Sequence, residues 1–269
     1  MLRLPAVAGR FYPSDSTELT SLIRTCLKPA EHTPQKKVRA CLVPHAGYIY
    51  SGPVAGAVYS AIELPKRAVI LGVRHFPRGQ PIAILSSGAW RTPLGDAPVD
   101  ANLAERLRAR CPLLREDEEA HRGEHSLEVQ IPFLQVLVAG FRFAPIVLGT
   151  LRFDDLVTIG EAVAEVLAEE EDQALIIASS DMNHYEDDAT TRRKDQRAIE
   201  RLLALDARGL FDTCMREEIS MCGLGPAVAM LTALRHLGGR HAELVRYATS
   251  ADVSGDREAV VGYAGMIFS

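Results

Sequence analysis

The sequence lacks several features that would assign it to a specialised class of protein. Its five cysteines include no C-x-x-C pair, which argues against a disulfide framework and a closed structural zinc site. It has no apolar run of the ~20 residues that a membrane span needs, and no apolar core of signal-peptide length near its N-terminus. The formal net charge is −5, without a basic patch suited to nucleic acid. We therefore expect a soluble cytoplasmic protein with no membrane or nucleic-acid partner.

The chain is long enough to bury a large hydrophobic core. Its 269 residues are 47% hydrophobic and 24% charged, which is ordinary for a globular protein. It contains no internal repeat, low-complexity stretch or clear linker. We therefore interpret residues 1–269 as a single domain.

Short apolar runs alternate with amphipathic stretches along the chain. The runs predict strands at residues 38–43, 68–71, 82–85, 143–148, 174–178, 244–248 and 259–268. Apolar residues at helical spacing predict helices at residues 19–27, 53–62, 102–110, 126–137, 156–168, 190–205 and 226–237. This alternation is typical of an α/β sandwich, with a largely parallel central sheet flanked by helices.

Three histidines lie just beyond the C-terminal ends of predicted strands. His45 follows C-L-V-P, His75 follows A-V-I-L-G by two residues, and His184 ends the segment S-S-D-M-N-H after A-L-I-I-A. In open α/β sheets, ligands bind beyond the carboxyl ends of parallel strands. We expect the strands before His45 and His75 to be sheet neighbours, which would bring both imidazoles to one metal or acid–base site.

Two polar segments leave two interpretations open. Asp181, close to His184, could orient or activate that ring for acid–base chemistry, or could serve in an ion pair or helix cap at a strand-to-helix turn. Glu124 and His125, in G-E-H-S, could form a polar wall of a pocket. They could equally cap the helix that follows, where a carboxylate also suits the helix dipole.

Cys222 is the cysteine best placed for chemistry. It lies in M-C-G-L-G-P, and Pro226 predicts that a helix begins just after it. A helix N-terminus stabilises the thiolate, which is the nucleophilic and metal-binding form of cysteine. The local sequence leaves open whether Cys222 is a ligand, a nucleophile or a small core residue. Cys26 and Cys41 fall on an apolar helix face and within a strand, so we expect them to be buried and inert.

Seven segments, in this order, resemble the Memo family, known in bacteria and archaea as AmmeMemoRadiSam system protein B. They are AVAGRFYP, VPHAGYIYSG, ILGVRH, TPLGDAPVD, GEHSLEVQIPFL, SSDMNH and MCGLGP. The resemblance covers nearly the whole chain, and several motifs in order are far more specific than any one alone. It implies the fold of class III extradiol dioxygenases and a mononuclear metal site.

The resemblance also implies roles for individual residues. The family's two motif histidines and its cysteine map to His45, His75 and Cys222, which makes these three the expected metal ligands. The family's pocket Asp and His map to Asp181 and His184, and in the related dioxygenases a histidine resembling His184 acts in acid–base catalysis. One departure stands out. Many Memo-like proteins carry two consecutive histidines where this chain has His75 and then Phe76, so a polar neighbour of the ligand is missing.

Three functions from different classes are consistent with these residues. We favour a mononuclear non-haem iron protein with a redox or dioxygenase-like oxidoreductase function, in which Fe(II) keeps positions open for oxygen or a small substrate. Copper and zinc accept the same donors, so a zinc hydrolase is a second reading. A serine hydrolase is disfavoured, because the sequence contains no G-x-S-x-G nucleophile elbow.

The third reading is a binding module without turnover. It would take a peptide or an anion, or handle metal, with Arg74, Tyr48 and a helix N-terminus around the ligand. The resemblance implies that such a module would work with AMMECR1-like and radical-SAM partner proteins.

Overall fold

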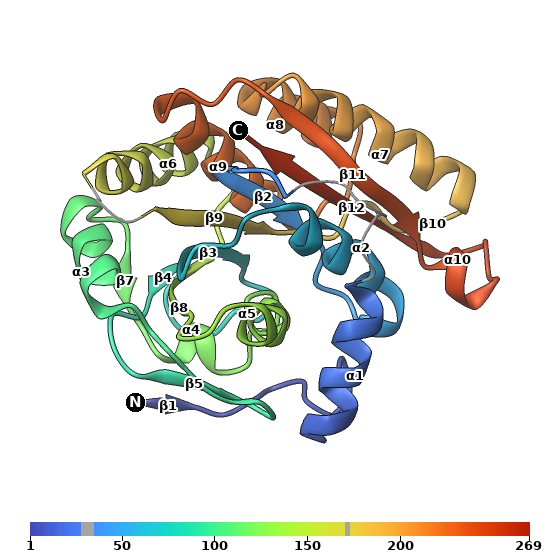
Figure 1. The fold of residues 1–269 in the computed structure, drawn as a ribbon. Coiled ribbons are helices and arrows are strands. Elements are labelled where there is room, and N and C mark those ends of the chain that lie inside the picture. Colours follow the sequence, from blue (N-terminus) through green and yellow to red (C-terminus); the bar gives the residue numbers. More distant parts are fainter. Residues whose placement is uncertain (28–34, 170–172) are drawn as a thin grey trace.

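A central sheet lies between two layers of helices, as Figure 1 shows for the computed structural model. The structure describes residues 1–27, 35–169 and 173–269. The strands are β1 (Leu2–Arg3), β2 (Ala40–Val43), β3 (Arg67–Val73), β4 (Ile82–Ile84), β5 (Ala89–Thr92), β6 (Gly95–Pro98), β7 (Arg115–Glu116), β8 (Arg142–Leu148), β9 (Ala174–Ser179), β10 (His184–Glu186), β11 (Ala242–Thr249) and β12 (Val260–Phe268). This architecture confirms the predicted α/β fold class.

The larger sheet has the strand order β10-β12-β2-β9-β3-β8-β4-β7, with β11 also paired to β12. Its centre, β2-β9-β3-β8, is parallel. The edges are mixed, because β12 is antiparallel to β2 and β4 is antiparallel to β8. A smaller sheet, β1-β5-β6, lies near the N-terminus of the chain.

Helices cover both faces of the larger sheet. They are α1 (Ser16–Cys26), α2 (Tyr48–Ala61), α3 (Ala101–Arg110), α4 (Glu119–Arg122), the 3₁₀ helix η1 (Glu128–Gln130), α5 (Ile131–Leu137), α6 (Phe153–Ala168), α7 (Asp188–Leu203), α8 (Ala207–Arg216), α9 (Leu224–His236) and α10 (Ala251–Ser254). Helices α6 to α9 form one layer, and α2 lies across β11 and β12 on the other face (Figure 1). No helix in the described part of the chain is long and apolar enough to cross a bilayer.

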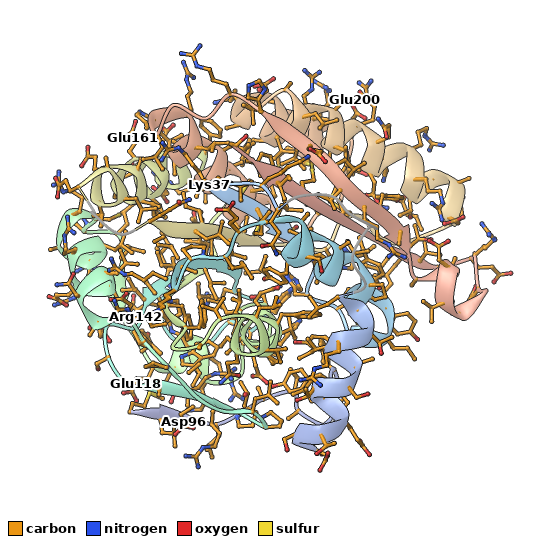
Figure 2. The ribbon with its side chains drawn as sticks, viewed as in Figure 1. Lys37, Asp96, Glu118, Arg142, Glu161 and Glu200 are labelled. Carbon is orange, nitrogen blue, oxygen red and sulfur yellow. The ribbon has the colours of Figure 1, made fainter. Side chains whose placement is uncertain are left out.

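Burial separates apolar from charged side chains in the expected way. Helix α9 is buried from Leu224 to Leu234, because it lies between the sheet and helices α6 and α8. The charged residues labelled in Figure 2 are exposed: Lys37, Asp96, Glu118, Arg142, Glu161 and Glu200. The hydrophobic effect therefore fixes which face each helix turns inward.

Strand order differs from the prediction in one respect that matters for the site. Strands β2 and β3 are not neighbours, because β9 pairs with both of them in parallel. A periodicity signal identifies strands but does not encode which strand inserts between two others. The correction places β9, the strand that leads to Asp181, at the centre of the sheet.

Three predicted site residues now share one geometric position. His45, His75 and Asp181 each lie two residues beyond the end of β2, β3 and β9 respectively. The parallel register pairs Val43 with Ser179 and Leu71 with Ala178, so these strand ends lie at one edge of the sheet. Side chains after such ends converge, as expected for the carboxyl edge of an open α/β sheet.

Some elements differ from the sequence prediction in length or existence. The helix expected at residues 53–62 begins at Tyr48 and contains Pro53 in its N-terminal half. The helix expected at residues 126–137 is divided into η1 and α5, with Pro132 at the start of α5. Helix α8 and the β5-β6 hairpin were not predicted, because α8 has only ten residues, although Leu210, Phe211 and Cys214 have helical spacing, and each hairpin strand has only four.

Candidate metal centre

A cavity of about 590 Å³ opens at the carboxyl edge of the sheet. Its walls include all five residues singled out in the sequence: His45, His75, Asp181, His184 and Cys222. Its remaining lining residues are Phe11, Ala46, Gly47, His125, Tyr185, Ser220 and Val261. The structure therefore brings the predicted residues to one place, whereas their chemical roles stay predictions.

The hydrogen bonds around His45 determine which of its ring nitrogens carries the proton. Its Nδ1 lies 2.9 Å from Oγ of Ser179. That hydroxyl donates its one proton to the Ser126 carbonyl at 2.6 Å and accepts from the Gln130 side chain at 2.9 Å. It can therefore only accept from His45, so Nδ1 is protonated and Nε2 keeps its lone pair. Burial and the nearby His75 lower the pKa of His45 to about 3, which keeps the ring neutral at pH 7.

His75 is held in the same tautomer by a carboxylate. Its Nδ1 lies 2.9 Å from Oε1 of Glu124, and its backbone N–H donates to Oε2 at 2.7 Å. Bonds from His75 and from the Ser126 N–H lower the pKa of the Glu124 carboxyl to about 2, despite its burial. The ionised carboxylate can only accept, so Nδ1 of His75 donates and Nε2 remains free. A carboxylate bonded to a ligating histidine in this way orients the ring and raises its basicity.

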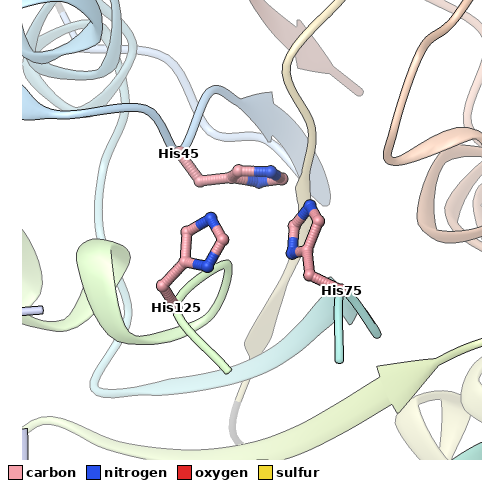
Figure 3. Close-up of side chains that lie close together, drawn as sticks. All are labelled: His45, His75 and His125. Atoms are coloured by element: carbon pink, nitrogen blue, oxygen red, sulfur yellow. The ribbon is translucent and has the colours of Figure 1, made fainter. Parts of the chain in front are cut away.

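His125 joins these two rings, although the sequence marked it only as a pocket wall or cap. Donor atoms of His45, His75 and His125 all lie within 4.8 Å of one another, and Figure 3 shows the three rings turned toward one another. The ring of His125 stacks on that of His75, with centroids 4.5 Å apart. Burial and His45 lower the pKa of His125 to about 4, so it too is neutral.

A tight contact with the end of β3 fixes the segment that carries His125. Ser126 Oγ donates to the Val73 carbonyl and accepts from the Val73 N–H, at 3.1 and 3.0 Å. A Cβ added to Gly72 would lie 2.5 Å from Leu127 Cδ1, so only glycine permits this approach. The signal in the sequence was G-E-H-S, which reads equally well as a helix cap.

Cys222 approaches the histidines from a loop far along the chain. Its Sγ lies 3.2 Å from Nε2 of His45, and it accepts the Asp181 N–H at 3.3 Å. Burial and the Asp181 carboxyl raise the pKa of the Cys222 thiol well above its usual range. The helix that begins at Leu224 therefore does not by itself stabilise the thiolate, as the sequence had suggested, because desolvation outweighs it. A bound cation would reverse this balance, because it deprotonates a coordinating thiol.

Asp181 supports the turn that carries His45. Its Oδ1 accepts the backbone N–H groups of His45 and Ala46, at 2.7 and 3.3 Å. Burial raises the pKa of its carboxyl above the ordinary value. The residue thus couples the end of β9 to the turn after β2.

His184 lines the same cavity from the edge strand β10. Its Nδ1 lies 3.0 Å from the Ser220 carbonyl oxygen, which can only accept a hydrogen bond. The neutral ring therefore carries its proton on Nδ1, and Nε2 is free to accept. In this respect His184 matches His45 and His75.

Other residues named from the sequence lie outside the cavity. Arg74 donates to the carbonyls of Arg78 and Gly79 and does not line the cavity. Tyr48 is buried and donates to the Val129 carbonyl, so it belongs to the core. Phe76 is half exposed and also absent from the lining. Without Arg74, the lining residues include no lysine or arginine that could hold an anion.

The donor chemistry fits a transition-metal ion. Two ligand atoms that are each about 2.0–2.3 Å from one ion lie roughly 3–4 Å from each other, and His45 Nε2 and Cys222 Sγ are 3.2 Å apart. Neutral imidazole and thiolate are suited to iron, copper and zinc rather than to magnesium or calcium. The low pKa of His45 leaves its Nε2 lone pair available without removing a proton from the ring.

The chain is similar to known proteins over its whole length. A family model for Memo-like protein matches residues 3–267. A MEMO1 family protein of Methanopyrus kandleri is 40% identical over 280 residues, which cover 100% of this chain and 99% of the relative. One of Aquifex aeolicus is 42% identical over 268 residues, with 99% of each chain covered.

A solved structure shows the same fold at much lower identity. An uncharacterized protein of Escherichia coli K12 superposes with a TM-score of 0.54 at 15% identity, covering 84% of this chain and 99% of its own. At this identity the likeness shows the fold alone. The family match and the relatives at about 40% identity go further: this chain belongs to the Memo family.

Proposed function

We propose that this protein binds one transition-metal ion, iron in its reduced form, and uses it in oxidation–reduction chemistry on a small substrate. The proposed ligands are Nε2 of His45, Nε2 of His75 and Sγ of Cys222. His184 and Asp181 are the proposed proton-handling residues. Copper and zinc are the alternative metals, because both accept the same donors.

The observation that carries this proposal is the hydrogen-bonding pattern that the two proposed histidine ligands share. Each Nδ1 donates to an acceptor, Ser179 Oγ for His45 and Glu124 Oε1 for His75. Each Nε2 therefore carries a lone pair, and the low pKa of His45 keeps its ring neutral. Both histidines line one cavity, and a partner that orients the ring through Nδ1 is typical of metal-ligating histidines.

The ligand number supports a reactive rather than a purely structural ion. Three protein donors leave open positions for a substrate or for oxygen, whereas structural sites are closed by four. When bound, the metal would supply a redox couple and a positive charge that polarises what binds beside it. The thiolate in place of a carboxylate favours a softer ion than the usual facial triad does.

The protein's own residues would manage protons in the cavity. Nε2 of His184 can accept a proton from a bound ligand, because Nδ1 is committed to Ser220. Asp181, whose pKa is raised by burial, can hold a proton and at the same time position the His45 turn. Phe11, Val261 and Tyr185 provide an apolar wall for the rest of the ligand.

Metal analysis of protein purified without added metal, under reducing and oxygen-free conditions, tests the proposal. We expect about one iron per chain, and loss of the metal in His45→Ala and Cys222→Ala. His241→Ala, at an exposed histidine outside the cavity, is the matched control. A stoichiometric metal that survives both His45→Ala and Cys222→Ala would refute the ligand set, and His125→Ala then identifies the all-histidine alternative.

We also propose a cytoplasmic location and two classes of partner protein. Cys26, Cys41, Cys111, Cys214 and Cys222 are all free thiols, which fits a cytoplasmic, reducing compartment. AMMECR1-like and radical-SAM proteins remain the proposed partners on the strength of the family resemblance alone. Cell fractionation and co-purification of the native protein test the two statements separately.

A further inference from the structure

A buried amide stands directly behind His184. Asn183 is fully buried, and all four hydrogen-bonding positions of its side chain are used. Its Oδ1 accepts from the N–H and the Oγ of Ser220, at 3.1 and 3.0 Å. Its Nδ2 donates to Glu186 and Thr191, at 2.7 and 3.3 Å. Donors and acceptors are matched, so the amide has one favourable orientation.

Ser220 transmits this orientation to the imidazole. Its Oγ accepts the backbone N–H of His184 at 2.8 Å, and its carbonyl accepts Nδ1 of the same residue at 3.0 Å. Asn183 thus forms two hydrogen bonds with Ser220, and Ser220 forms two with His184. The position of the carbonyl that fixes the His184 tautomer depends on the buried amide.

The backbone of Asn183 is fixed in turn by a buried carboxyl. Asp195 accepts the Asn183 N–H at 2.8 Å and the Tyr247 hydroxyl at 2.6 Å. A Cβ on Gly262 would lie 1.8 Å from Oδ2 of Asp195, so the glycine in β12 is what admits the carboxyl to this position. A continuous set of hydrogen bonds therefore runs from β11 and α7 through Asn183 and Ser220 to His184.

The backbone beside His184 is held away from its relaxed conformation. Tyr185 has φ of 62°, a left-handed conformation that is unfavourable for a tyrosine, and its side chain is 78% exposed. Packing of the Tyr185 ring therefore does not account for the conformation. The register between β10 and β12 also shifts between His184 and Glu186. This backbone conformation places the Glu186 carboxylate where it accepts a hydrogen bond from Asn183 Nδ2. The Asn183 amide therefore helps to stabilise the unfavourable conformation of Tyr185.

We propose that Asn183, acting through Ser220, is a positioning residue that holds His184 in the Nδ1–H tautomer with Nε2 available to the cavity. Ser220 lies two residues before Cys222 in the same loop. The Asn183 amide therefore connects the segment that carries His184, the proposed base, to the loop that carries Cys222, the proposed sulfur ligand. The catalytic meaning rests on the proposed function, but the tautomer itself does not.

Nitrogen-15 NMR of the histidine rings tests this inference on full-length protein freed of metal by a chelator. Long-range proton–nitrogen spectra report which ring nitrogen is protonated, and loss of one set of signals in His184→Gln assigns the residue. We expect wild-type His184 to show Nδ1 protonated and Nε2 unprotonated. Asn183→Ala should give a mixture of both tautomers, because the Ser220 carbonyl is no longer held in place.

A matched variant separates positioning from general packing. Thr191→Val removes one buried partner of Asn183 but leaves both contacts to Ser220, so we expect the wild-type tautomer to persist. If Asn183→Ala does not fold, Ser220→Ala decides instead, because Ser220 is exposed and only its hydroxyl is lost. A minor Nε2–H tautomer in Ser220→Ala supports the proposal.

Two results would overturn the inference. One is wild-type protein in the Nε2–H form, and the other is an unchanged tautomer in whichever of the two variants folds. Neither depends on metal content, because the measurement uses metal-free protein. Conversely, absence of iron in the native protein would refute the proposed function and leave the tautomer result standing.

Discussion

Nε2 of His45 and Sγ of Cys222 lie 3.2 Å apart, although 177 positions separate them in the sequence. The first comes from the turn after β2 and the second from the loop before α9. The contact forms only when the sheet and the helix layer are both assembled, so the proposed metal site belongs to the complete fold. A metal that binds there would therefore stabilise the folded chain.

Glu124→Gln should weaken metal binding without removing a ligand. The neutral amide no longer provides an ionised acceptor for Nδ1–H of His75, and the ring becomes less basic and less well oriented. Loss of such a partner typically costs about 10–100-fold in metal affinity. Competition with a chromogenic chelator measures the change, and Glu119→Gln, at an exposed ion pair with Arg122, serves as the control. Equal affinities in the two variants would argue against His75 as a ligand.

Gly223→Ala should displace the loop that carries Cys222. An added Cβ would lie 2.3 Å from Ser180 Cβ and 2.6 Å from the Ser179 carbonyl oxygen. Overpacking of this kind costs about 1–3 kcal/mol of stability, and the loop can relieve it only by moving Sγ away from His45. Urea unfolding and metal titration together check both effects. In Gly123→Ala the new Cβ would meet only Phe76, at 3.9 Å, so wild-type behaviour is expected there.

Arg3→Met should destabilise the protein strongly. Arg3 forms a buried ion pair with Glu128, which also accepts the N–H groups of Ala6 and Val7 and the hydroxyl of Tyr12. Removing one partner leaves an uncompensated buried charge, at a cost of about 3–5 kcal/mol.

Denaturant unfolding of Arg3→Met should therefore show a much lower midpoint. Arg91→Met breaks the exposed pair with Asp96, so its unfolding midpoint should change little. The same Glu128 contacts fix the segment that brings Phe11 to the cavity, so a minor effect of Arg3→Met would contradict the role assigned to this anchor.

The pH dependence of stability should include a contribution from buried His121. Burial lowers its pKa to about 4, whereas the unfolded chain titrates near 6.5. The unfolded state then binds the proton first, so the contribution is complete above pH 6.5 and is lost as the pH falls toward 4. Between pH 7 and pH 5 this amounts to roughly 2 kcal/mol.

A variant comparison isolates that contribution from groups with the opposite sign, such as Asp195, whose pKa is raised to about 7 by burial. The difference in unfolding free energy between wild type and His121→Gln should shrink by that amount from pH 7 to pH 5. His241→Gln, at an exposed histidine, serves as the control. A pH-independent difference for His121→Gln would contradict this account, because it would mean that His121 has the same pKa in the folded and unfolded states.

The sequence predicted individual strands and helices better than it predicted how distant strands are arranged in the sheet. The strands before His45, His75 and Asp181 were recognisable because each is a continuous apolar run. Their order was not, because the sequence does not record that β9 inserts between β2 and β3. Helix α8 and the β5-β6 hairpin were missed because they are short, with ten residues in α8 and four in each hairpin strand.

In the candidate site too, residues with a local sequence signal were predicted, whereas roles that depend on distant contacts were not. All five residues chosen from strand ends and motifs line one cavity, since strand ends and tight turns leave a local signature. The sequence left Glu124 and His125 open between a pocket wall and a helix cap and did not mark Asn183, because the contacts that define their roles are made by distant segments. Glu124 and His125 read equally well as a helix cap until the structure placed them against His75.

Anomalous diffraction at the iron edge, from crystals of protein purified without added metal, tests the central claim most directly. We predict one peak in the cavity that is strong above the iron edge and weak below it. The peak should lie about 2.0–2.3 Å from Nε2 of His45, Nε2 of His75 and Sγ of Cys222. An empty cavity, or an ion bound by His45, His75 and His125 with the sulfur out of bonding distance, would contradict the account.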